Sequence, residues 1–203
     1  MELLNAMLHA TSPVRSHLRA AIRLALCFVL WPASVGAAEA ELLEYDVKAA
    51  YLYKFGLFIE WPSAAFASPT SPLNLCVVGE GPIGPILDAT AGKQRVNERE
   101  VNVRRLKTVG RDAGCHILYI QDSDAQPSGQ IIAALRGSWV LTVTDSRAAS
   151  GAGRGIINFV LKDNRMRFDI DDEAAAQNNL GISSKLLSLA LNVKPRQARG
   201  GAK

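Results

Sequence analysis

The sequence predicts an α/β fold, with one mixed parallel and antiparallel sheet sandwiched by helices in a single domain. Two observations lead to this prediction. Through the first half of the chain, segments with the helical period alternate with short apolar runs, as in parallel strands joined by helical crossovers. Further on, two alternating runs flank a polar turn at 162–164, which indicates an antiparallel hairpin. The chain after residue 40 has the length of one ordinary domain.

The first predicted element is an aromatic-rich amphipathic helix over residues 45–61. Its apolar side chains recur at the three- and four-residue steps of a helix face, at Val47, Ala50, Tyr51, Phe55, Phe58 and Ile59. Because Pro62 disfavours helical backbone at the residue before it, we expect the helix to end near Trp61. So much aromatic surface on one helix indicates a core element, a partner surface, or both.

The remaining elements follow in the order of the chain. Apolar runs predict strands at 73–78, 115–120 and 139–144, and an alternating pattern predicts one at 100–106. Helices are expected at 82–89 and 128–135. A polar, glycine-rich loop is expected at 146–155, then hairpin strands at 155–161 and 165–170, and then helices at 171–179 and 183–193. The strands of the first half are expected to be parallel, with the hairpin antiparallel at the end of the same sheet.

The two ends of the chain have compositions that differ from the body. Residues 1–40 contain a basic run, a short apolar run and then small residues, which predicts a signal peptide cleaved near 37–40. A retained membrane anchor is the alternative. Residues 194–203 form a basic, glycine-containing tail that we expect to be disordered. The body at 41–193 is then close to neutral, which excludes the clustered basic face of a nucleic-acid-binding protein.

Two of the three cysteines, Cys76 and Cys115, lie in the predicted mature chain. An even number of cysteines in an oxidising compartment favours one disulfide. Such a bond would close a loop of about 40 residues and stabilise the fold by roughly 4 kcal/mol in the chain-entropy view. Two buried thiols in neighbouring strands are the alternative.

The segment 79–84 reads G-x-G-x-x-G between a predicted strand and a predicted helix, which is the setting of a dinucleotide-binding turn. In that interpretation Gly79, Gly81 and Gly84 would bind a small ligand or nucleotide. Pro82 removes one of the backbone donors that an anion would use. A tight turn with no ligand is therefore the competing interpretation.

Other chemistry-bearing residues have simpler explanations. His116, the one histidine of the predicted mature chain, lies inside an apolar strand. Four acids gather where the hairpin meets the next helix, a position where carboxylates cap helices and offset the helix dipole: Asp169, Asp171, Asp172 and Glu173. Ser183 is expected to cap the last helix. We therefore expect no enzyme active site, no metal and no cofactor.

Three groups of segments, in order, resemble the YfiR-like family of bacterial periplasmic proteins. They cover almost all of residues 44–193 and comprise the helix at 47–55 with Glu60-Trp61-Pro62, the runs 75–79 and 115–120, and the runs 155–160, 167–170 and 182–187. The resemblance implies an α/β homodimer that regulates and does not catalyse. It implies repression of an inner-membrane diguanylate cyclase through the cyclase's periplasmic sensor domain, and so control of cyclic di-GMP and biofilm formation. An outer-membrane lipoprotein would sequester the repressor.

The resemblance also assigns particular residues. The pair Cys76 and Cys115 matches cysteine positions of the family. A second pair that some members carry around the glycine-rich loop has no counterpart at 146–155. The resemblance places the partner surface on the C-terminal hairpin and the segment after it, around Phe168, Asp169 and Ala175.

Overall fold

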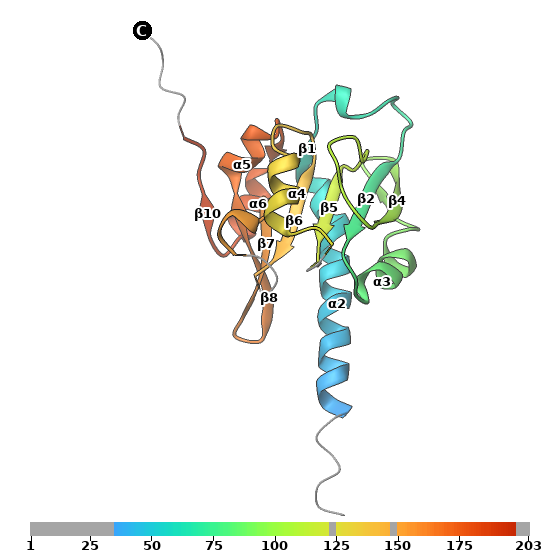
Figure 1. Ribbon diagram of the computed structural model, residues 1–203, viewed down its shortest axis with the longest axis vertical. Helices are drawn as coiled ribbons and strands as arrows, with labels where there is room; N and C mark the ends of the chain where they lie inside the picture. Colours follow the sequence, from blue (N-terminus) through green and yellow to red (C-terminus); the bar gives the residue numbers. More distant parts are fainter. Residues whose placement is uncertain (1–34, 122–124, 147–149, 198–203) are drawn as a thin grey trace, which may run out of the picture. The chain divides into compact units, whose positions relative to one another are not determined.

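The computed structural model describes residues 35–121, 125–146 and 150–197 (Figure 1). The chain divides into two units, Met1–Glu41 and Leu42–Lys203. In the first unit the structure describes only a helical backbone from Val35 onward. The predicted leader at 1–34 lies outside the described residues, so the signal peptide stays a prediction. All the described strands belong to the second unit.

An eight-stranded sheet with the order β10-β8-β7-β6-β5-β2-β4-β3 forms the centre of the second unit. Its strands are β2 (Leu73–Val78), β3 (Arg95–Val96), β4 (Arg99–Leu106), β5 (Ile117–Ile120), β6 (Leu141–Asp145), β7 (Ile157–Lys162), β8 (Arg165–Asp171) and β10 (Val193–Lys194). Strands β4, β2, β5, β6 and β7 are mutually parallel, whereas β7 and β8 form an antiparallel hairpin. The predicted α/β fold with a mixed sheet is confirmed.

The helices are α2 (Val35–Phe55), α3 (Ile83–Thr90), α4 (Ser128–Ala134), α5 (Asp172–Gln177) and α6 (Ser184–Leu189). Alternation of side chains along the strands creates two apolar layers. One layer joins the sheet to α2, α3, α5 and α6, and includes Leu52, Leu75, Leu87, Phe159 and Leu186. The other joins the opposite face to α4, and includes Val78, Leu118 and Ile131. The sheet is therefore sandwiched by helices, as predicted.

The prediction that the first helix ends near Trp61 is wrong. Helix α2 ends at Phe55, a short 3₁₀ turn follows at Gly56–Phe58, and Ile59–Glu60 forms strand β1. Strand β1 pairs antiparallel with β9 (Gly181–Ile182) in a separate two-stranded sheet. Gly56 lets the chain pack closely against β3 at this point, because a Cβ there would lie 2.9 Å from Val96 Cγ1. The pairing partner is distant in sequence, so the local helical pattern did not indicate it.

The C-terminal segment also differs from the prediction. The last helix covers only Ser184–Leu189, and the chain then forms β10, which runs parallel to β8 through the pairs Val193↔Ile170 and Lys194↔Asp171. Disorder therefore does not begin at Lys194, since residues 194–197 pair with the sheet and with α5. Residues 198–203 lie outside the described residues.

Candidate functional site

The hairpin β7–β8 carries a two-stranded ribbon at 160–167 (Figure 1). Strand β7 pairs with β6 only up to Phe159, so its last three residues continue beyond that neighbour. The turn residues Asp163 and Asn164 both have left-handed backbone, with φ of 50° and 56°. That conformation is typical of a tight type I′ hairpin turn and suits asparagine and aspartate. The local sequence therefore specifies a ribbon with free edges.

The two faces of this ribbon differ in chemistry. Lys162 and Arg165 are direct cross-strand partners, and Arg167 follows on the same face. All three are exposed, and none pairs with a carboxylate within the described part of the chain. On the other face Leu161 lies opposite Met166, and Leu161 is 48% exposed. The ribbon thus offers one basic face and one apolar face, which suits recognition of another protein.

Two of the three residues assigned to the partner surface are buried. Phe168 is 3% exposed and Ala175 is 0% exposed. The Phe168 ring lies 5.2 Å from that of Phe55 and 5.8 Å from that of Tyr51, centroid to centroid. Direct contact of Phe168 or Ala175 with a partner is therefore excluded in this conformation. They position the base of the hairpin and helix α5 from inside the core.

Asp169 is the member of the predicted set that reaches the surface. Its carboxylate accepts hydrogen bonds from Arg154 Nη2 and from Asn192 Nδ2, each at 2.8 Å. Its side chain retains 19% exposure. Asp169 therefore joins β8 to the loop before β7 and to the segment before β10.

The other acids at this junction are explained by helix capping and ion pairing. Asp171 caps α5 by accepting the Ala174 N–H at 2.8 Å, and its second oxygen pairs with Lys194 at 2.9 Å. Asp172 accepts two hydrogen bonds from Arg196, at 2.9 and 3.0 Å. These hydrogen bonds to Asp172 raise the pKa of the Arg196 guanidinium. The sequence indicated the cap but not the basic partners, since the tail was expected to be disordered.

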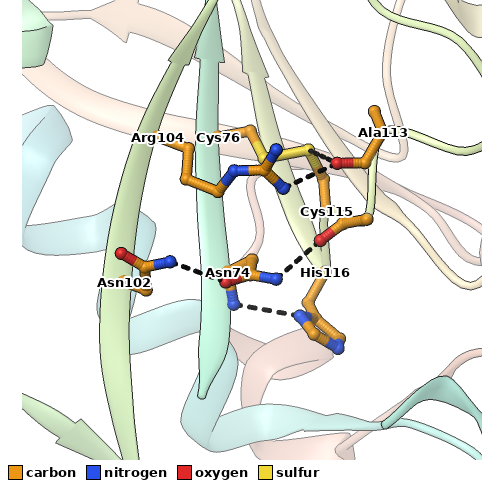
Figure 2. The surroundings of a disulfide bond; sticks show 8 residues. Asn74, Cys76, Asn102, Arg104, Ala113, Cys115 and His116 are labelled. Atoms are coloured by element: carbon orange, nitrogen blue, oxygen red, sulfur yellow. Dashed lines mark hydrogen bonds between the residues drawn. A yellow bond between two sulfur atoms is a disulfide. The ribbon is translucent and has the colours of Figure 1, made fainter. Parts of the chain in front are cut away.

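The predicted disulfide between Cys76 and Cys115 is present, with 5.8 Å between the Cα atoms. It joins strand β2 to the segment that precedes β5, and both cysteines are buried in the α4-side layer. Figure 2 shows Arg104 beside the disulfide, where its guanidinium donates to the Ala113 carbonyl at 2.7 Å. The alternative of two free thiols does not describe this structure.

Asn74 and His116 hold the same segment on its other side (Figure 2). Asn74 Nδ2 donates to the Gly114 carbonyl at 2.7 Å, and the Asn74 N–H donates to His116 Nδ1 at 2.9 Å. Because Nδ1 accepts, the ring hydrogen lies on Nε2, which is 3.0 Å from the Ala65 carbonyl. Burial lowers the pKa of His116, in opposition to this hydrogen bond. The histidine is thus a neutral structural residue.

The glycine turn after β2 lies at the point where the parallel sheet reverses its strand order. Crossovers from β2 and from β5 lead to opposite sides of the sheet, which is where such sheets bind ligands. Side chains of the protein itself occupy the space that the glycines leave. A Cβ on Gly81 would lie 2.4 Å from Gln121 Nε2, and one on Gly84 would lie 2.7 Å from Arg105 Nε. The positive φ values of Gly79 and Gly81, 94° and 152°, also call for glycine in the turn itself. Both observations favour the tight-turn interpretation.

One buried polar cluster was not indicated by the sequence. Lys48 on α2 is 1% exposed and pairs with Glu44 on its own helix and with Asp145 at the end of β6. Burial, and then the charge of Asp145, raise the pKa of the nearby Tyr119. A lysine within the apolar run of α2 was the available signal. Its partner on β6 could not be known without the fold.

Within the described residues no cluster of three side chains of metal-ligand type occurs, and no helix is both long and apolar enough to cross a bilayer. A family model described as YfiR/HmsC-like matches residues 45–191. The match includes the sheet from β2 to β8, both cysteines and the hairpin ribbon. A search of curated proteins finds no match.

Proposed function

Since this chain belongs to the YfiR/HmsC-like family, we propose that it represses an inner-membrane diguanylate cyclase by binding the cyclase's periplasmic sensor domain. In this proposal, binding keeps cyclic di-GMP low and restrains biofilm formation. The family match over residues 45–191 is the observation that carries the proposal. It supports a regulatory periplasmic protein and not an enzyme.

The disulfide agrees with a periplasmic location. Disulfides persist in oxidising compartments and are rare in the bacterial cytosol. The bond between Cys76 and Cys115 is buried and joins two parts of one layer, as a structural disulfide does. Together with the predicted leader at 1–40, it supports export of the protein.

We assign the cyclase contact to the ribbon at 160–167. Lys162, Arg165 and Arg167 form a basic face without intramolecular carboxylate partners in the described structure, so an acidic partner surface would complement it. The exposed Leu161 adds apolar contact area on the other face. The partner in this assignment is an acidic face of the sensor domain. Homodimer formation and sequestration by an outer-membrane lipoprotein are further parts of the proposal.

A second candidate function is binding of a small ligand or nucleotide at the turn formed by Gly79, Gly81 and Gly84. The position of this turn at the switch point of the sheet favours it. The neighbouring Gln121 has a buried side-chain oxygen without a hydrogen-bond partner in the described structure. Thermal-shift titration with ATP, GTP and NAD tests this function. A rise in Tm that Gln121→Ala abolishes would support it, and no rise with any of them would exclude it.

The repressor proposal is tested with the purified protein and the purified periplasmic domain of the diguanylate cyclase encoded beside its gene. We expect direct binding in a titration calorimeter. The double variant Lys162→Glu with Arg165→Glu should weaken binding at least tenfold, about 1.4 kcal/mol. A matched control, Lys93→Glu with Lys107→Glu, makes the same charge change at exposed positions outside the ribbon.

Deletion of the gene gives an independent result in cells. We expect cyclic di-GMP to rise in the deletion strain and to fall when the wild-type gene is restored. Restoration with the Lys162→Glu, Arg165→Glu variant should leave the level high. The repressor function is refuted by an unchanged cyclic di-GMP level together with no binding in the calorimeter. Equal weakening by the control variant would refute the assignment to the ribbon alone.

A further inference from the structure

A polar cavity of about 530 Å³ lies between α4, α5 and the loop before β7, over strands β6, β7 and β8. It does not include the basic face of the ribbon, the disulfide or the glycine turn. Two side chains of the sheet, Thr142 and Asn158, line it, and they alternate along β6 and β7 with the core residues Leu141, Val143 and Ile157. The cavity therefore opens on the face of the sheet that α4 covers.

Thr142 and Asn158 keep hydrogen-bond donors that the protein does not satisfy well. Asn158 is 1% exposed, and its Oδ1 accepts from Thr144 at 2.8 Å, but the contact of its Nδ2 with the Phe159 carbonyl is 3.5 Å long. Thr142 is 3% exposed, and its Oγ1 accepts the Ile156 N–H at 3.1 Å. Among the described residues no acceptor takes the Thr142 hydroxyl hydrogen. Buried donors of this kind are normally paired, so they favour a ligand with acceptor oxygens.

The charged side chains around the cavity have a positive excess. Arg154 pairs with Asp169 at 2.8 Å, and Lys194 pairs with Asp171 at 2.9 Å. Arg136 at the end of α4 also lines the cavity and has no carboxylate partner in the part of the chain that the structure describes. An anion would therefore find the Arg136 guanidinium, the Thr142 hydroxyl and the weakly bonded Asn158 amide.

We infer that this cavity binds a small organic carboxylate. The carboxylate oxygens would accept from Thr142 and Asn158, and Arg136 would supply the opposite charge in the geometry that guanidinium groups offer to carboxylates. Asp169 and Asp171 would accept from hydroxyl or ammonium groups elsewhere on the ligand. The inference goes beyond the proposed function, because it requires neither the cyclase nor the basic face of the ribbon.

The test is titration calorimetry of the purified protein with glucuronate, succinate and glutamate. Glucose and succinamide serve as uncharged counterparts of the first two. We expect at least one carboxylate to bind with a Kd below about 1 mM, and its uncharged counterpart to bind at least tenfold more weakly. Preference for glucuronate would identify a hydroxy acid as the ligand class, and preference for glutamate would identify an amino acid. Absence of binding by all three carboxylates overturns the inference.

Variants of residues that line the cavity show whether the carboxylate binds there. Arg136→Gln should weaken binding at least tenfold, whereas Lys93→Gln, which removes one positive charge at an exposed position outside the cavity, should leave it unchanged. Thr142→Val removes the hydroxyl donor and should also weaken binding, while Thr142→Ser keeps the donor and should retain it. Equal effects of Arg136→Gln and Lys93→Gln would overturn the inference. Because the Arg136 side chain is exposed and has no carboxylate partner in the described structure, its replacement should not affect folding.

Discussion

The part of the sheet around β2, β4 and β5 and the part around β7, β8 and β10 differ in the interactions that hold their flanking segments. On the side of β2, β4 and β5, a buried disulfide and hydrogen bonds from Asn74 and Arg104 fix the segment before β5. On the side of β7, β8 and β10, ion pairs between partly exposed side chains connect the last segment to β8 and α5, and the loop before β7 to β8. Exposed ion pairs contribute at most about 1 kcal/mol each, whereas a disulfide contributes several. The segment before β5, on what we call the covalent side, is therefore held more firmly than the last segment, on what we call the ion-paired side.

This difference in how firmly the segments are held coincides with the location of the two proposed binding sites. The proposed docking ribbon and the polar cavity both lie on the ion-paired side, with β7 and β8. A partner or ligand that binds there displaces only weak interactions, so little binding energy is lost to rearrangement. Unfolding measurements on variants of the two sides compare how much free energy of unfolding their interactions contribute.

The largest expected effect is on the covalent side. Replacing both Cys76 and Cys115 by alanine should lower the free energy of unfolding by about 4 kcal/mol, because the unfolded chain loses a loop constraint of about 40 residues. Urea unfolding at neutral pH measures it. Wild-type protein unfolded with a reductant present is the control, and it should lose a similar amount. A loss below about 1 kcal/mol would contradict a stabilising disulfide.

The next prediction compares the stability contributed by the buried base of the hairpin with that contributed by its exposed end. Phe168→Ala should lower the free energy of unfolding by about 3 kcal/mol, since it removes a buried ring packed against Phe55 and Tyr51. Leu161→Ala, on the neighbouring strand of the ribbon but 48% exposed, should cost less than about 0.5 kcal/mol. Urea unfolding of both variants gives the comparison. Similar losses would mean that the ribbon is part of the core and not a free surface.

A pH effect should come from His116 on the covalent side. Its pKa in the folded protein lies below the ordinary value of 6.5 because the ring is buried. As the pH falls through 6.5, the unfolded state takes up a proton that the folded state does not, so stability should decrease. Above that pH both states are neutral and the effect is absent.

Unfolding curves of the wild-type protein and of His116→Gln, recorded from about pH 7.5 to about pH 5.5, measure this contribution. The glutamine keeps one acceptor and one donor for Asn74 and Ala65. We expect the variant to lose less stability than the wild type over this interval. Equal pH dependence of the two proteins would show that His116 is not the titrating group.

Most of the fold was predictable because local patterns specify it. Most of the parallel strands are continuous apolar runs, β4 alternates, and the hairpin turn carries residues suited to left-handed backbone, Asp163 and Asn164. The short pairs β1–β9 and β8–β10 were missed, since two-residue strands have no periodicity of their own. Pairing with a distant segment, and not local propensity, decided the conformations of Ile59–Glu60 and Val193–Lys194.

The candidate sites were less predictable than the fold. The cysteine pair followed from composition, because two cysteines in a chain predicted to be exported have few other roles. The polar cavity did not, since Thr142, Asn158 and Arg136 come from three separate elements and form no motif. The burial of Phe168 was also missed, because it depends on the aromatic rings of a helix more than a hundred residues earlier in the chain. The burial of Ala175 was missed too.

The smallest expected change in stability concerns an ion pair on the ion-paired side. Arg196→Ala removes the two hydrogen bonds to Asp172 and should lower the free energy of unfolding by at most about 1 kcal/mol, since the pair is partly exposed. Arg165→Ala, a cation without an ion pair in the described structure, should change it by less than about 0.5 kcal/mol. Urea unfolding of both variants in low and high salt measures the difference, and the loss from Arg196→Ala should shrink in high salt. A salt-independent loss of stability near that of the disulfide variant would mean that the last segment is as firmly held as the covalent side. The ribbon and the cavity would then have to bind their partners without rearrangement.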